Sequence, residues 1–215
     1  TPPVIARESW AMAVTPSTKL DPGARQAVLG TAAAAIDAGL GRSIASPPDT
    51  RRLPPPLDAH RASFVTLTLG RELRGCCGTL EPARPLLLDV WHNAQASAFH
   101  DPRFPPLSLA EWRSVELEVS VLTPCERVVV ASEHELLLAL EPGRDGLVLA
   151  WQGMRATFLP KVWEQVSGAP EFLRRLKQKA GWPADFWASD LEVWRYETEI
   201  VGPVRAAESG QPTAA

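Results

Sequence analysis

In the stretch VELEVSVL, residues 115–122, apolar and polar side chains alternate without a break from Val115 to Val121. Neighbouring side chains on a β-strand point to opposite faces, so this pattern predicts a strand with one face in a core and the other facing away. The apolar set consists of Val115, Leu117, Val119 and Val121. A shift of one residue in register would bury Glu116 and Glu118 instead, so the pattern constrains the strand strongly.

Other segments predict helices and strands that do not follow a regular βαβ order. Asp21 as N-cap and Pro22 at the first helical position indicate a helix that ends near Leu40. Further helices are expected over 85–100, 133–140, 160–167 and 170–180, and further strands over 63–69, 73–80, 146–151, 154–159 and 191–201. This mixture predicts an α+β fold with mostly antiparallel sheet.

Composition narrows the class of protein. With 215 residues, 45% of them hydrophobic, the chain can form one large domain or two small lobes around a real core. The net charge of −3 and the lack of a Lys/Arg run longer than two residues argue against a nucleic-acid binder. There is no apolar stretch of ~18 residues and no secretory signal in TPPVIARESW, so no membrane span is expected. Three cysteines without disulfide spacing favour the cytoplasm.

Prolines divide the chain rather than forming one repetitive block. There are 21 of them, and SPPDTRRLPPPLD over 46–58 reads as a partly extended connector. Residues 1–19 and 203–215 show no hydrophobic period and are expected to be loose tails. The folded domain is therefore assigned to residues 20–202, with a boundary between lobes that the sequence leaves open.

Several motifs in the same order resemble the AMMECR domain family, the protein A component of the AmmeMemoRadiSam set. They are ASFVTL (62–67), LRGCCG (73–78), DPRFPPL (101–107), LEVSVLTP (117–124), ATFLPKV (156–162) and FLRRLKQKAG (172–181). The family usually has isoleucine at position 77, where this chain has Cys77. The resemblance implies an α+β fold with two unequal lobes and a cleft between them. It implies no known reaction, and it suggests a Memo-like protein and a radical-SAM-type protein as partners.

Cys76 is the candidate catalytic residue, as a nucleophile or redox thiol, with Arg74 close in sequence. The alternative is a small buried side chain in a strand, because free cysteine is among the most buried residue types. Strand alternation places Arg74 and Cys76 on one face, toward the cleft, and Leu73, Gly75 and Cys77 on the other, toward the core. Cys77 is therefore expected to pack like the family's isoleucine, and a redox pair of the two adjacent cysteines is disfavoured.

The remaining candidates are ligand- or partner-binding residues. Arg74 and Arg103 each present a planar fork suited to a carboxylate or phosphate, or to a structural salt bridge for which Glu118 could supply the carboxylate. Asp101 reads as a cap or turn residue, and Lys179 complements a helix end or points into the cleft. The full set is Arg74, Gly75, Gly78, Asp101, Arg103, Phe104, Glu118, Lys161 and Lys179.

The sequence favours an accessory binding protein over an enzyme. The histidines show no HxxxH spacing and no CxxC is present, so no metal site is expected. No phosphate-binding glycine loop and no Ser/His/Asp order is visible, so no cofactor is expected. A single cysteine without a placed base is weak support for catalysis. The alternative function is an enzyme that uses Cys76 on a small anionic or peptide substrate.

Overall fold

The structure, a computed structural model, describes residues 19–205, which form two compact units. The large unit comprises residues 19–122 and 199–205, and the small unit comprises residues 123–198. Residues 1–18 of the predicted N-terminal tail and residues 206–215 of the C-terminal tail lie outside the described residues. Within residues 19–205, no helix is both long and apolar enough to cross a membrane.

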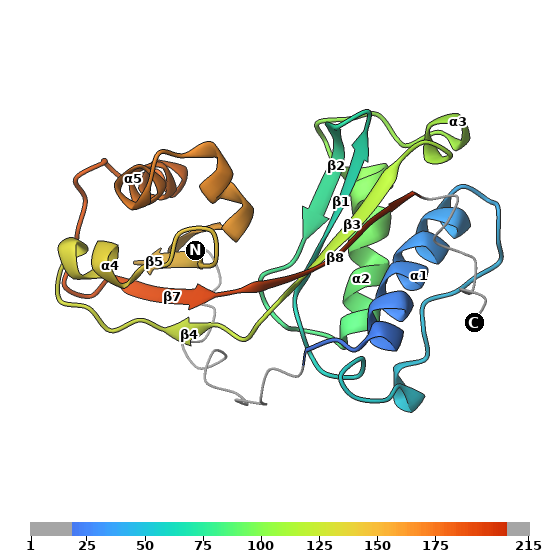
Figure 1. Cartoon of the computed structure of the whole chain (residues 1–215), viewed down its shortest axis with the longest axis horizontal. Helices are drawn as coiled ribbons and strands as arrows, with labels where there is room; N and C mark the ends of the chain where they lie inside the picture. The colour runs from blue at the N-terminus through green and yellow to red at the C-terminus, as the bar shows by residue number, and fades with distance from the viewer. Residues whose placement is uncertain (1–18, 206–215) are drawn as a thin grey trace, which may run out of the picture. The chain divides into compact units, whose positions relative to one another are not determined.

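The large unit consists of one four-stranded sheet and two principal helices (Figure 1). Its elements are α1 (Pro22–Gly39), a 3-10 turn (Thr50–Arg52), β1 (Ser63–Leu69), β2 (Glu72–Gly78), α2 (Leu86–Gln95), a π-helical turn (Ala96–His100), α3 (Leu109–Trp112), β3 (Glu116–Leu122) and β8 (Thr198–Arg205). The strand order is β2-β1-β3-β8, and β1 runs antiparallel to both β2 and β3. The large unit therefore has the α+β architecture that the sequence predicts.

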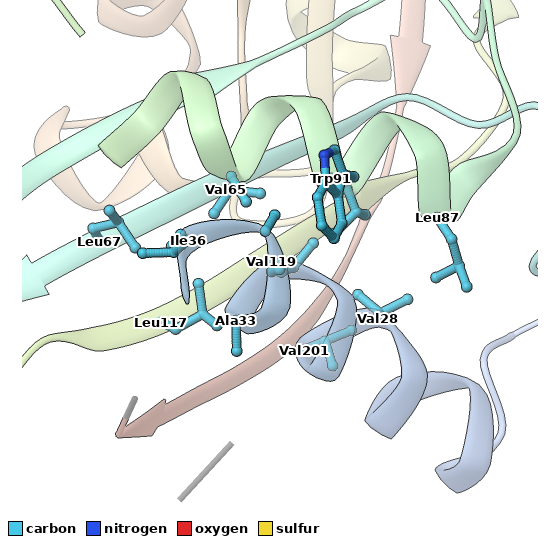
Figure 2. Close-up of a cluster of buried hydrophobic side chains, with 14 of the residues drawn as sticks. Val28, Ala33, Ile36, Val65, Leu67, Leu87, Trp91, Leu117, Val119 and Val201 are labelled. Carbon is cyan, nitrogen blue, oxygen red and sulfur yellow. The ribbon is translucent and has the colours of Figure 1, made fainter. Parts of the chain in front are cut away.

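The core of the large unit lies between the sheet and the two helices. Asp21 starts α1 as predicted, because its Oδ1 accepts the Ala24 N–H at 2.7 Å. Figure 2 shows Val28 and Ile36 of α1 and Trp91 of α2 packed against strand side chains. The predicted register of β3 is confirmed, since its apolar set is completely buried: Val115, Leu117, Val119 and Val121. The opposite face of the sheet, called the outward face below, carries the half-buried Thr66 and Glu118.

The small unit packs two helices and a 3-10 turn with a second antiparallel sheet. Its elements are β4 (Glu126–Arg127), α4 (Glu133–Ala139), β5 (Gly146–Trp151), β6 (Met154–Phe158), a 3-10 turn (Pro160–Gln165), α5 (Ala169–Lys179) and β7 (Glu192–Tyr196), with the strand order β4-β7-β5-β6. The predicted hairpin turns at Gln152 and Gly153, which both have positive φ. Trp163 stacks on Phe172 with ring centroids 4.0 Å apart in the core of this unit.

Two of the predicted boundaries are wrong. The single strand expected over 191–201 is divided into β7, in the small unit's sheet, and β8, which pairs in the large unit's sheet. Between them the Glu197 backbone exchanges hydrogen bonds with Thr123, whose Oγ1 accepts the Glu197 N–H at 2.8 Å. Apolar alternation does not reveal a change of sheet. β8 also includes residues 203–205, which were assigned to the C-terminal tail, because these residues continue the strand.

Candidate functional site

The LRGCCG motif forms β2, the edge strand of the large unit's sheet, and side chains from the DPRF segment bind its main chain. The Cys76 N–H donates to Asp101 Oδ2 at 2.9 Å, and Arg103 Nη2 donates to the Cys76 carbonyl oxygen at 3.1 Å. The Cys77 N–H donates to Ser97 Oγ at 2.8 Å. Edge strands carry unpaired N–H and C=O groups. The Asp101–Arg103 pair therefore takes the place of a neighbouring strand at Cys76.

Asp101 and Arg103 form a two-point ion pair within one loop. Arg103 Nε donates to Oδ1 at 2.9 Å and Nη2 donates to Oδ2 at 2.7 Å. The Asp101 side chain is only 3% exposed, whereas that of Arg103 is 53% exposed. The Arg103 guanidinium, together with the backbone N–H groups of Cys76 and Arg103, holds the pKa of Asp101 well below its ordinary value. Asp101 is thus an anion at neutral pH, and its predicted role as a turn residue is only part of what it does.

Arg74 is also bound within the large unit. Its Nε donates to Glu111 Oε1 at 2.8 Å, and its Nη2 donates to the Pro105 carbonyl at 3.0 Å. The side chain is 10% exposed. The Arg74 guanidinium and then Ser108 lower the pKa of Glu111 to about 2. Arg74 therefore pairs with Glu111, which the sequence interpretation did not single out. Arg103 pairs with Asp101. The sequence interpretation had expected Glu118 to supply the carboxylate for one of these arginines.

Phe104 links the two arginines. The guanidinium carbons of Arg74 and Arg103 lie over its ring, 5.8 and 5.5 Å from the centroid. Such contacts between a cation and an aromatic face are attractive. The half-buried Phe104 therefore acts as a support between the two ion pairs of the motif.

Close packing explains why glycine occupies both of the motif's glycine positions, 75 and 78. A β-carbon on Gly75 would lie 2.1 Å from the Ser97 carbonyl oxygen, and one on Gly78 would lie 2.3 Å from the ring of Phe64. No real contact is that short. Close packing of β2 against the π-helical turn and against β1 accounts for glycine at both positions, so neither needs a ligand to explain it.

The predicted orientation of Leu73 is wrong. Leu67 pairs with Gly75 but Thr68 pairs with Leu73, so Arg74 is the extra residue of a β-bulge. The bulge shifts Leu73 to the outward face, beside Thr68, where it is 42% exposed instead of lying in the core. Arg74, although predicted to face a cleft, is buried against Glu111. Strict alternation fails at this position because it assumes an unbroken ladder.

Cys76 lies on the outward face, as its alternation with Cys77 predicts. Thr66 of β1 is its cross-strand partner, with Thr66 Oγ1 at 3.6 Å from Cys76 Sγ, and Glu118 of β3 is the next residue in the same row. All three side chains are half-buried. A thiol, a hydroxyl and a carboxylate thus cross three neighbouring strands, and this row, Cys76–Thr66–Glu118, is called the Cys76 row below.

Cys77 differs from Cys76 in position and chemistry. It pairs with Val65, which is completely buried in the core. Burial, and then the negative charge of Asp101, raise the pKa of the Cys77 thiol above its ordinary value. A raised pKa leaves little thiolate at neutral pH, so Cys77 is a poor nucleophile. Both cysteines are free thiols.

The two lysine candidates belong to the small unit. Lys179 Nζ donates to the Thr157 carbonyl at 3.0 Å and lies 5.2 Å from the centroid of Phe158, and burial lowers its pKa. Lys161 is exposed on the 3-10 turn that follows β6. The sequence interpretation missed Lys177, which is completely buried and pairs with Glu133 at 2.7 Å. Its spacing of four residues from Leu173 places it on the core face of α5, so helical periodicity could have predicted that Lys177 is buried.

A buried polar network near β1 was also missed. Asp89 of α2 is 0% exposed and accepts hydrogen bonds from the Ser63 backbone and hydroxyl, from Thr79 and from Asn93. Burial raises the pKa of Asp89 above its ordinary value, despite these donors. The network ties α2 to the strands, and Arg84 lies 3.4 Å from the same carboxylate. Asp89 lies among the apolar inward positions of α2, so the helical periodicity of the sequence could have predicted that it is buried.

Among residues 19–205, no group of three or more His, Cys, Asp or Glu side chains is arranged to hold a metal ion. The site therefore consists of an edge strand, β2, whose main chain is bound by Asp101, Arg103 and Ser97, and of the Cys76 row on the outward face. Its chemistry offers a thiol, hydrogen-bonding groups and one half-exposed guanidinium, that of Arg103.

The sequence matches one family model, and the sequence and structure are similar to several uncharacterised proteins. The AMMECR1 family model matches residues 29–201. Protein MJ0810 of Methanocaldococcus jannaschii is 38% identical over 155 residues, which are 68% of this chain and 75% of that protein. Protein MK0488 of Methanopyrus kandleri is 36% identical over 180 residues, 77% of this chain and 83% of that protein. The crystal structure of the uncharacterized protein PH0010 from Pyrococcus horikoshii superposes with a TM-score of 0.72 at 34% identity, covering 80% of this chain and 88% of that one.

Proposed function

Because this chain belongs to the AMMECR1 family, we propose that it is an accessory binding protein that uses the outward face of the large unit's sheet as its contact surface. The main support is that the motif's charged side chains are already paired within the fold. Arg74 and Asp101 are buried and paired within the fold, so they stabilise β2. What the motif presents outward is the Cys76 row, in which the Cys76 thiol contacts the Thr66 hydroxyl, at 3.6 Å, and not a general base.

Apolar side chains at the two ends of the outward face support the same proposal. Leu73 of β2 is 42% exposed, and Ile200 of β8 is 44% exposed. Ile200 alternates with Val201, which is buried in the core, so Ile200 points to the outward face. Exposed apolar side chains beside polar groups occur in protein–protein interfaces, which combine apolar patches with polar ones. The partners we propose are the Memo-like protein and the radical-SAM-type protein that the family resemblance suggests.

Binding of purified partners tests this proposal. A tagged Memo-like protein and a tagged radical-SAM-type protein from the same organism are each mixed with this chain. We expect capture by at least one of them, and Leu73→Asp should abolish it. Leu109→Asp is the matched control, because Leu109 is also 42% exposed but lies on α3. Absence of capture by either protein, or an equal loss in both variants, contradicts the proposal.

The second candidate is an enzyme with Cys76 as its nucleophile. The observation that favours it is the position of Cys76 Sγ, 3.6 Å from a hydroxyl on the outward face, where Cys76 is half-buried. Labelling by iodoacetamide at pH 7 separates the two functions. Modification of Cys76 much faster than free cysteine supports the enzyme, and Cys77, whose pKa is raised by burial, serves as the slow internal reference. A Cys76 thiol no faster than free cysteine supports the binding protein.

A further inference from the structure

Three arginines of the large unit line a single pocket at the end of the β1–β2 hairpin. Arg71 lies in the hairpin turn, Arg113 follows α3, and Arg205 ends β8; Figure 1 shows α3 near this turn. Glu116 and Leu69 complete much of the wall. The pocket has a volume of about 460 Å³, which lies in the range of small-molecule sites.

Among the residues that the structure describes, these three arginines differ from the other arginines of the large unit in having no partner. Within the described residues, none of their guanidinium groups forms an ion pair or a hydrogen bond. The other arginine side chains described in this unit are all engaged, with a carboxylate for Arg25, Arg42, Arg51, Arg74, Arg84 and Arg103 and with a backbone carbonyl for Arg61. Among the described side chains of the large unit, the unpartnered guanidinium groups therefore gather at one place.

The charges in the pocket call for an anion. Arg71, Arg113 and Arg205 contribute three positive charges, against a single negative charge from Glu116. Guanidinium groups present planar pairs of donors that match the oxygens of a phosphate. The half-buried Glu116 accepts hydrogen bonds, so it suits a ligand that also carries a hydroxyl or amino group.

The backbone conformation of Arg71 also supports an anion site. Arg71 has φ 73°, in the left-handed region that glycine and asparagine favour in a two-residue hairpin turn. An arginine is conformationally unfavourable there, so the turn itself does not explain why this position carries an arginine. A role of its guanidinium in binding an anion explains the arginine.

We propose that this pocket binds a small molecule with a phosphate monoester and a neighbouring hydroxyl or amino group. A nucleic acid or membrane surface fits less well, because the arginines converge on a pocket and the chain as a whole carries a net charge of −3. The site is separate from the Cys76 row and does not depend on the function proposed for it.

Titration of the ¹⁵N-labelled full chain with three probes tests the proposal: glucose 6-phosphate, inorganic phosphate and glucose. We expect saturable shifts of arginine Nε–H signals with glucose 6-phosphate, weaker binding of inorganic phosphate and no binding of glucose. Arg71→Gly suits the turn's positive φ and removes the guanidinium without harming the hairpin. Arg71→Gly and Arg113→Ala should each weaken glucose 6-phosphate binding about tenfold or more. Arg42→Ala, which removes an exposed arginine paired with Asp37, is the matched control and should leave binding unchanged.

Three results overturn the proposal. The first is no saturable shift with either phosphate at millimolar concentration. The second is binding that Arg71→Gly and Arg113→Ala leave intact, which places the anion elsewhere. The third is arginine-dependent binding to a single-stranded oligonucleotide or to anionic lipid vesicles that is tighter than binding to glucose 6-phosphate. That outcome assigns the pocket to a macromolecular surface instead.

Discussion

Asp101→Asn removes the charge of the Asp101–Arg103 pair while keeping the size of the side chain. Asp101 accepts hydrogen bonds from two backbone N–H groups and from Nε and Nη2 of Arg103. A hydrogen bond to a charged group contributes about 1.5–3 kcal/mol, but Arg103 is half-exposed and water screens part of the interaction. We therefore expect the free energy of unfolding to fall by about 2 kcal/mol, which lowers Tm by roughly 4–8 °C in a chain of this size.

Urea denaturation and thermal melting measure this change, and the chain offers a close control. Asp49 and Arg51 have the same spacing and the same pairing within one loop, with Arg51 Nε 3.0 Å from Asp49 Oδ1. The Asp49 side chain is 52% exposed and bonds no strand, so Asp49→Asn should leave Tm unchanged. Equal effects of Asp49→Asn and Asp101→Asn would refute the reasoning that the second pair stabilises the edge strand at Cys76.

The pH dependence of the same comparison follows from the lowered pKa of Asp101. A carboxyl group whose pKa is lower in the folded than in the unfolded state stabilises the fold above its unfolded pKa, about 3.9. That contribution is lost as the pH falls toward the folded pKa. The stability difference between the parent and Asp101→Asn should therefore stay constant from pH 8 to 5 and shrink below about pH 4. A difference that grows on acidification contradicts this assignment.

Five further substitutions test the packing. Gly75→Ala should destabilise by about 2–3 kcal/mol, because its β-carbon meets a backbone carbonyl, whereas Gly30→Ala, in open space on α1, should stabilise by up to about 1 kcal/mol in the same melting assay. Lys177→Met should be neutral or stabilising in urea, while Glu133→Gln should cost about 2 kcal/mol because it leaves a buried ammonium without its counter-charge; the opposite order would show that the ion pair itself stabilises the small unit. Cys77→Ile should change Tm by less than about 3 °C, since the half-buried position lies beside the core residue Val65, and a larger loss would mean that no room exists there for two more side-chain atoms.

Local patterns in the sequence predicted most of the elements and the family, and these are confirmed, whereas the strand expected over 191–201 is divided between two sheets. The alternation of residues 115–122 determined which face of β3 is buried, because the period of a strand needs no knowledge of its neighbours. The cap at Asp21 and the turn at Gln152 and Gly153 are likewise set by side chains within a few residues of one another. The motifs identified the AMMECR1 family, whose model matches residues 29–201.

The errors concern pairings between distant segments. Glu111, not Glu118, is the carboxylate found for Arg74, and only the folded chain brings residues 37 positions apart together in that geometry. The bulge at Arg74 depends on how β1 and β2 pair, so the outward position of Leu73 could not be read from alternation. The same holds for the arginine pocket, because Arg71, Arg113 and Arg205 come from three distant segments that the sheet brings to one place.

The order of the strands has a consequence for synthesis on the ribosome. β8 completes the large unit's sheet by pairing with β3, yet the whole small unit, residues 123–198, lies between them in the chain. At about 5–20 residues per second, this insertion takes roughly 4–15 s to be translated. During that time β3 has an open edge, which is a template for wrong pairing with other chains. A nascent chain that stalls within the insertion should therefore recruit chaperones more strongly than one that stalls after β8 has emerged.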